Sequence, residues 1–286
     1  MQNGEITVAD RVQYHSILRQ KCVDALAVGG IVFAAALFGI LTRSSNHLAV
    51  FWIANALLVG VFVRRPDWAS VWGWTAALIG YLTADLVTGA SWNKSILLTA
   101  ANLAGCITGY VLFSFLDEAD RRLSRPMSVF YMCVIVAAAS TMSGIFGGFA
   151  NPILFDAPAI DGFYFWLLAD TVNYVAILPV IMTMPGLSRR KLQDKLDVRG
   201  FFSRGEFLPL VALIISCLMG MLLGGPGALA FPVPALLWCA VSFSLFPVTI
   251  LSFLFTAWVL MSMHAGFFPH PSTWRAAAPC CHCVSG

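Results

Sequence analysis

Long apolar runs are the feature of this sequence that most restricts its fold. Runs of about 20 apolar residues match the ~30 Å hydrocarbon core of a lipid bilayer. Such runs occupy residues 22–41, 49–63, 68–88, 95–116, 127–149, 162–184 and 207–224. A longer apolar block follows at 228–265 and is broken near 244–247. Only 11% of all residues are charged, against about a quarter in soluble domains, so the sequence predicts a polytopic membrane protein.

The expected fold class is an all-α, polytopic transmembrane helical bundle. The runs are unbroken, whereas the strands of a membrane barrel alternate in polarity over about ten residues. Two full spans within 228–265 would give nine in total and an external C-terminus. A short re-entrant element at 49–63 or 231–244 would give eight and an internal C-terminus, and both segments are shorter than a full crossing needs. We expect about eight spans, in a range of seven to nine.

Basic residues in short loops predict the orientation, because cytoplasmic loops carry an excess of Lys and Arg. If the N-terminus is cytoplasmic, the inner segments hold 14 of the 17 basic residues. The outer loops then hold only Arg43 and Lys94. The basic residues assigned to the inside are Arg11, Arg19, Lys21, Arg64, Arg65, Arg121, Arg122, Arg125, Arg189, Arg190, Lys191, Lys195, Arg199 and Arg204. A cytoplasmic N-terminus is therefore expected.

Two carboxylates lie within the apolar spans, where an ionisable group costs roughly 2.5–3.5 kcal/mol on insertion scales. Asp170 precedes Asn173 by three residues, a spacing that places both side chains on one helix face. Asn102 lies beside small residues that would let another helix approach closely. We expect Asn55, Asn102 and Asn173 to form hydrogen bonds between helices around a carboxylate. Asp85 is followed directly by polar residues, which indicates a wetted position at the membrane interface.

These polar residues have two interpretations, and the sequence leaves both open. In the structural one, the groups satisfy each other and fix helix register. In the functional one, Asp170 and its neighbours bind a ligand or a proton. Tryptophans near span ends are typical of aromatic belts at the interface, although an aromatic ligand cage is the alternative. The candidates for contact with a ligand or signal are Asp170, Asn173, Asn102, Asp85, Asn55, Trp52 and Trp166.

Four stretches, in this order, resemble the bacterial membrane-associated sensor domain of the first type. The first is FWIANALLVGVFVRRPDWASVWGWTAALIGYLTADLVTG, and the second is AANLAGCITGYVLFSFL. The third is FYFWLLADTVNYVAILPVIM, and the fourth is FPVPALLWCAVSFSLFPVTILSFLFTAW. Together they cover roughly residues 20–265. The chain departs from the family at residues 53–56, where Pro-Pro and Gly are usual, and at 242–244, where an Arg–Phe–Gly turn is usual.

The resemblance implies an integral membrane sensory module of the bacterial inner membrane, joined to a cytoplasmic output domain. Such outputs are histidine kinases or enzymes that make or break cyclic di-GMP. The sequence shows neither the phosphoacceptor helix of a kinase nor the motifs of a cyclase, so we expect a signal-input role and no enzyme activity. The expected organisation is a cytoplasmic segment at 1–21, the sensory domain at 22–265 and an unstructured tail at 266–286, from a truncated or frameshifted signalling protein.

The expected partners are the lipid bilayer, a periplasmic or membrane-borne signal, a cytoplasmic output domain or protein and, as one arrangement, a second copy of the chain. No nucleic acid, cofactor or metal is expected. Cys280, Cys281, His282 and Cys283 are consecutive, whereas structural zinc sites space their ligands.

The alternative function is a small membrane transporter or channel, because buried polar residues and Pro-interrupted helices suit a substrate site at mid-membrane. No internal repeat relates the two halves of the sequence, which counts against it. A membrane-embedded enzyme has less support, because no HExxH or GxSxG motif is present.

Overall fold

The structure is a computed structural model that describes residues 8–42, 51–185, 207–225 and 227–264. Within these ranges all regular secondary structure is helical, which confirms the all-α class. The chain divides into two compact units, Met1–Met182 and Thr183–Gly286. The expected tail at 266–286, with its cysteines, and the basic connection at 187–206 lie outside the described residues.

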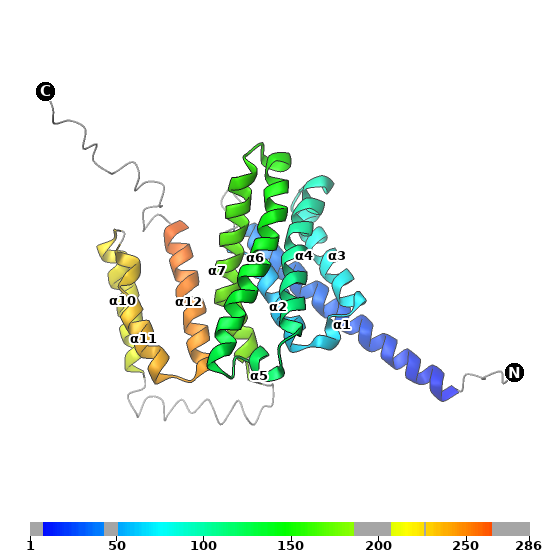
Figure 1. The fold of residues 1–286 in the computed structure, drawn as a ribbon, viewed down its shortest axis with the longest axis horizontal. Coiled ribbons are helices and arrows are strands. Elements are labelled where there is room, and N and C mark those ends of the chain that lie inside the picture. The colour runs from blue at the N-terminus through cyan, green and yellow to red at the C-terminus, as the bar shows by residue number, and fades with distance from the viewer. Residues whose placement is uncertain (1–7, 43–50, 186–206, 226, 265–286) are drawn as a thin grey trace. The chain divides into compact units, whose positions relative to one another are not determined.

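The first unit contains the long helices that carry the predicted polar residues (Figure 1). Its elements are α1 (Val8–Leu41), α2 (Ile53–Arg64), η1 (Pro66–Trp68), α3 (Val71–Val87), α4 (Trp92–Ser114), α5 (Glu118–Arg121), α6 (Pro126–Phe155) and α7 (Ala159–Thr183). The helices agree closely with the predicted runs, except that α1 begins at Val8 rather than near residue 22. The polar segment before the first apolar run thus continues the same helix.

The second unit contains α10 (Leu208–Leu223), η2 (Ala228–Ala230), α11 (Val233–Ser242) and α12 (Leu245–His264). The break expected near 244–247 separates α11 from α12. Pro232 lies at the N-cap of α11 and Pro234 in its first turn, where the missing N–H of proline costs no helical hydrogen bond. Proline therefore marks a helix start in this unit.

Among the residues that the structure describes, five helices are long and apolar enough to cross a membrane, which indicates a membrane protein. They are Ser16–Leu41 within α1, α4, α6, α7 and Leu245–Met263 within α12. Large apolar side chains lie on the outer surface, as with Leu222 at 81% exposure, and lipid is the solvent that such a surface suits. The helices α2, α3, α10 and α11 are apolar but shorter, so the count of about eight spans stays a prediction.

Two of the connections predicted to be cytoplasmic, the one after α2 and the one around α5, lie at one end of the first unit. Arg64 at the end of α2 and Arg122 after α5 are close enough to repel each other. At the opposite end, the Lys94 ammonium lies 5.3 Å from the centre of the Phe155 ring. The end that carries α5 is at the bottom of Figure 1. The up-and-down order of α2 to α7 therefore gathers the basic loops on one side.

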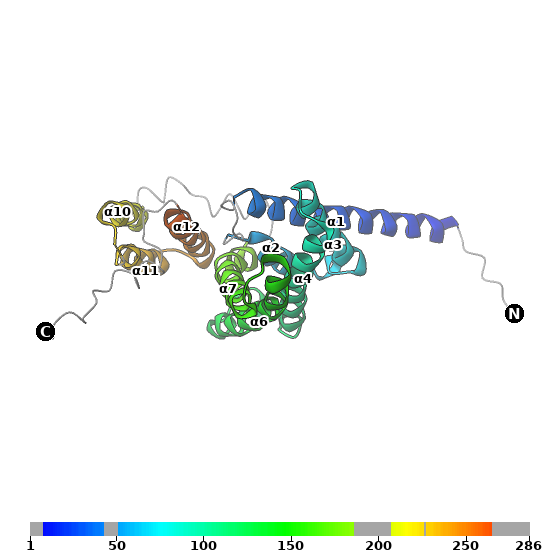
Figure 2. The same ribbon diagram turned by 90° about the horizontal axis from the view of Figure 1, so that it is seen from above.

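Small residues allow these helices to pack with close backbones, as is common in membranes. A Cβ on Gly80 of α3 would lie 2.8 Å from the carbonyl oxygen of Gly29 in α1. A Cβ on Gly147 of α6 would collide with the indole of Trp166 in α7. Seen from above in Figure 2, α2 lies among α1, α4 and α7. Helix α2, the shortest of the apolar helices in the first unit, is thus surrounded by longer helices.

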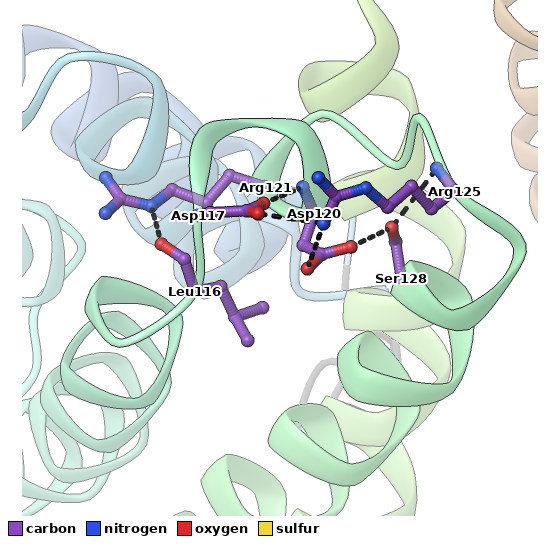
Figure 3. A network of polar contacts seen from close by, with 6 residues as sticks. All are labelled: Leu116, Asp117, Asp120, Arg121, Arg125 and Ser128. Carbon is purple, nitrogen blue, oxygen red and sulfur yellow. Dashed lines mark hydrogen bonds and ion pairs between the residues drawn. The ribbon is translucent and has the colours of Figure 1, made fainter.

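The connection between α4 and α6 is held by the polar network shown in Figure 3. Asp117 caps α5 by accepting a hydrogen bond of 2.8 Å from the backbone N–H of Asp120. The Arg125 guanidinium contacts both carboxylates, at 2.8 Å from Asp117 and 3.3 Å from Asp120. Ser128 of α6 donates to Asp120 at 2.7 Å. This network fixes α5 against the start of α6.

We expect this connection to loosen in acid through Asp117. The Asp120 backbone N–H and the Arg125 side chain lower the pKa of Asp117. The stabilisation is therefore complete above the ordinary aspartate pKa of about 3.9 and is lost as the pH falls through the lowered pKa. The measurement is amide hydrogen exchange at Asp120, corrected for the intrinsic effect of pH. Asp117→Asn should abolish the pH dependence, whereas Glu118→Gln should keep it. Protection unchanged in wild type down to about pH 3 would contradict the prediction.

Candidate functional site

The side chain of Asn55 is the hub of a polar cluster in the interior of the first unit. Asn55 lies in the first turn of α2 and is 1% exposed. Its Nδ2 donates to Oδ1 of Asn102 in α4 at 3.1 Å. The same nitrogen donates to the Asp170 carboxylate in α7, at 3.2 Å from Oδ1 and 3.3 Å from Oδ2. The predicted hydrogen bonding of Asn55 and Asn102 around Asp170 is therefore present in the structure.

The carbonyl oxygen of Asn55 is occupied as well. It accepts a hydrogen bond of 2.8 Å from the Tyr81 hydroxyl of α3 and one of 3.1 Å from Nε1 of Trp52. An amide side chain offers one acceptor oxygen and two donor hydrogens. Both ends of this one side chain are therefore engaged, and it joins α2 to α3, α4 and α7.

Asn173 binds the N-terminus of α2. Its Oδ1 accepts a hydrogen bond of 3.0 Å from the backbone N–H of Trp52, the N-cap residue of α2. Its Nδ2 donates to the carbonyl of Ala169, one turn earlier in α7, at 2.7 Å. The first N–H groups of a helix lack partners inside the helix. In α2 a neighbouring helix supplies the acceptor for one of the backbone N–H groups at this end.

The Cys106 thiol lies on the same side of α4 as Asn102 and extends the cluster. Its sulfur is 3.7 Å from the backbone oxygen of Asn55, 3.8 Å from the Tyr174 hydroxyl and 3.9 Å from the Tyr81 hydroxyl. The two tyrosines, the cysteine and Ser143 are not among the site residues expected from the sequence. Helical spacing could have found three of them, because Cys106, Tyr174 and Tyr81 are four positions from Asn102, Asp170 and Asp85.

Three buried hydroxyls in α4 and α6, those of Thr99, Ser140 and Ser143, make no hydrogen bond of standard geometry. The Ser143 hydroxyl faces the Asp170 carboxylate. It also lies so close to α4 that a Cβ on Gly105 would collide with it. Most buried polar groups in proteins are paired, and the Asp170 carboxylate is the polar group that the Ser143 hydroxyl faces.

The other candidate residues differ from expectation in their surroundings. Asp85 is 7% exposed, so it is buried in the protein and is not the wetted interfacial residue that was expected. It lies one turn beyond Tyr81 on the same face of α3. Trp166 packs against Leu98 and Ala101 of α4, and its position is interior rather than in an interfacial belt. The polar residues that follow Asp85 in the sequence suggest an exposed position. They carry no information on how α3 packs against its neighbours, and that packing buries Asp85.

Trp52 joins the cluster through its own side chain as well as its backbone. Its ring also packs against α1, since a Cβ on Gly39 would lie 2.6 Å from the indole. The side chain is half-buried. Trp52 is therefore the member of the cluster that links Asn55 to the edge of the bundle.

The far end of α2 is attached to α7 too. Arg64 donates from Nη1 to the carbonyl oxygens of Ile181 and Met182, both at 3.1 Å. Between the two ends, Gly60 of α2 faces the Ile181 side chain, which a Cβ would approach to 2.7 Å. Helix α2 is thus bound along its length to α7, with polar contacts at both ends.

Comparisons with known proteins support a signalling context. The chain is 27% identical over 236 residues to "Probable diguanylate cyclase DgcF" of Escherichia coli O157:H7, which covers 77% of this chain and 45% of that protein. It is 35% identical over 81 residues to "Probable diguanylate cyclase DgcF" of Escherichia coli strain K12, covering 28% of this chain and 22% of that protein. The chain spans less than half the length of these relatives.

No family model matches the chain, and no solved structure matches it. The resemblance to the membrane-associated sensor family therefore stays a prediction. Similarity to a diguanylate cyclase, together with several apolar helices, fits the membrane part of a cyclic di-GMP signalling protein. The ligand-binding roles of the candidate residues also stay predictions.

Proposed function

We propose that this chain is the integral membrane signal-input domain of a cyclic di-GMP signalling protein. The observation that carries the proposal is similarity to a probable diguanylate cyclase over 77% of the chain, in a chain built of apolar helices. Cyclase activity would reside in a catalytic domain beyond the matched part, and this chain would regulate it. Of the two outputs considered from sequence, this favours the cyclic di-GMP enzyme over the histidine kinase.

The proposed location is the bacterial inner membrane, with a cytoplasmic N-terminus. The basic loops on one side of the first unit support this orientation, because Lys and Arg are retained in cytoplasmic loops. Arg64, Arg65, Arg121, Arg122 and Arg125 would then face the cytoplasm, where a cyclase finds its nucleotide substrate. The proposed partners are the bilayer, a periplasmic or membrane-borne signal and the cytoplasmic output domain, with a homodimer as one arrangement.

Within this domain, the cluster around Asp170 is the proposed place where the signal acts. Polar groups inside a membrane cost free energy, and this cluster brings together side chains from α2, α3, α4 and α7. A signal can shift an equilibrium only by binding two arrangements with different affinity. A cluster that contacts so many helices would change their packing when its hydrogen bonds change.

The test is a fusion of this chain to the cyclase part of the Escherichia coli relative, with cyclic di-GMP measured per inserted protein. Asp170→Asn keeps the size of the side chain but removes its ability to ionise. We expect output to change about fivefold or more, the lower range of allosteric coupling. Asp161→Asn replaces an exposed acid in the first turn of the same helix and should leave output unchanged.

Equal output from the two variants, with normal insertion, would contradict a signalling role for Asp170 and would support the structural interpretation of the cluster. Solute flux in proteoliposomes that requires Asp170 would instead favour the transporter alternative.

A further inference from the structure

We propose that Asp170 is a proton-binding site and that the proton it holds is the signal read by this domain. This inference rests on the proposed input function and names the chemical nature of its signal. A proton from water would bind the carboxylate, convert it to the neutral acid and return to water on release. No other reactant is needed.

The first support is the absence of a compensating charge. Asp170 is 3% exposed and lies within a helix long and apolar enough to cross a membrane. In the described parts of the chain, no Lys, Arg or His forms an ion pair with it, since the observed pairs join Glu118, Asp117 and Asp120 to arginines around α5. An ionised carboxylate in such a place is costly, and a bound proton removes the charge.

The second support is the direction of the hydrogen bonds. The Asn55 amide nitrogen can only donate, and it divides its hydrogens between Asp170 and Asn102. A protonated carboxyl must also donate, so it needs an acceptor. Other hydroxyls in the bundle bond to the carbonyl one turn back, as Thr108 does to Ala104 and Thr171 to Leu167. Ser143 makes no such bond, so its oxygen is available.

A hydroxyl can serve both states of the acid. Ser143 faces Asp170 from α6. It can donate to the ionised carboxylate and accept from the neutral carboxyl, because a hydroxyl holds one hydrogen and two lone pairs. Gaining or losing the proton would reverse this one interaction. It would also alter the charge that Asn55 contacts, and through Asn55 the bonds to Trp52 and Tyr81.

The other titratable groups of the cluster are weak acids. They are the Tyr81 hydroxyl from α3, the Cys106 thiol from α4 and the Tyr174 hydroxyl from α7. The cluster members from α2 and α6 are the amide of Asn55, the indole of Trp52 and the Ser143 hydroxyl, which do not ionise near neutral pH. Asp85 is the second carboxyl of the region and serves as a matched comparison.

The experiment is infrared spectroscopy of the full chain in liposomes during a pH titration from about pH 4 to about pH 9, a range that brackets ordinary and perturbed carboxyls. We expect a carboxylic C=O band that persists above about pH 5.5, where ordinary carboxyls are ionised, and that disappears as the pH rises further. Asp170→Asn should abolish this band, and Asp85→Asn should retain it. A band that is unaffected by Asp170→Asn would overturn the proposal.

A second variant tests the hydroxyl without removing the acid. Ser143→Ala should shift the C=O band to higher frequency, because the neutral carboxyl loses its acceptor. Thr141→Ala removes an exposed hydroxyl of the same helix and should leave the band in place. An unshifted band in Ser143→Ala would overturn the role of Ser143.

The experiments distinguish a failure of the proton-binding proposal from a failure of the proposed signal-input function. Fusion output that depends on Asp170, without a titrating band, would overturn the proton as signal but keep the input function. A titrating band with output independent of Asp170 would overturn the input role of this site while leaving its proton binding established.

Discussion

Asn55→Ala is expected to lower the free energy of unfolding by about 2 kcal/mol. The substitution removes hydrogen bonds to Trp52, Tyr81, Asn102 and Asp170. Interhelical hydrogen bonds in membranes contribute roughly 0.6 kcal/mol each on average, and buried partners left unsatisfied add to the loss. The measurement is reversible unfolding in mixed micelles of mild and denaturing detergent, followed by circular dichroism.

The matched control is Asn93→Ala, which truncates an exposed asparagine in the first turn of α4. We expect it to change the unfolding free energy by less than about 0.5 kcal/mol, as surface substitutions usually do. Equal effects at positions 55 and 93 would mean that the cluster contributes nothing specific to stability.

Gly80→Val is expected to separate α1 from α3 and to cost about 1–3 kcal/mol, the usual range for overpacking. A Cβ at this position meets backbone on the other helix, 2.8 Å from the oxygen of Gly29 and 3.2 Å from the nitrogen of Phe33. Backbone cannot rotate away as a side chain can, so the helices themselves must move. Thermal unfolding in detergent, or cross-linking between cysteines introduced into α1 and α3, would measure the change.

Gly30→Val provides the comparison, because a Cβ there has no heavy atom within 4 Å. Both glycines are helical, so the intrinsic effect of valine on a helix is shared. If Gly80→Val and Gly30→Val lower the stability to unfolding by the same amount, close packing between α1 and α3 does not stabilise these two helices.

Much of the helix arrangement could be predicted because lipid imposes simple rules. A span must be apolar and helical, so the apolar runs predict where most of the helices lie. A polar side chain that faces lipid costs free energy, so the sequence predicts that Asn55, Asn102 and Asp170 face one another inside the bundle. The structure joins these three directly.

The remainder of the cluster depends on rotation of each helix about its axis, which the apolar pattern of these spans does not define. Tyr81, Cys106 and Tyr174 are apolar enough to face either lipid or the interior. Asp85 appeared exposed because polar residues follow it, yet the packing of α3 buries it. The partner of each residue was set by tertiary contacts that local sequence does not encode.

The attachment of α2 to α7 at both ends limits how this pair can move. Sliding α2 along α7 by one residue, about 1.5 Å, would disturb the Asn173 contact with Trp52 and the Arg64 contact with the last carbonyls of α7 at once. A tilt of the two helices as a single rod would leave both contacts intact. A conformational change in this part of the protein should therefore be a joint tilt of α2 and α7. When their ends at one face of the bilayer move, their ends at the other face should move in the opposite direction.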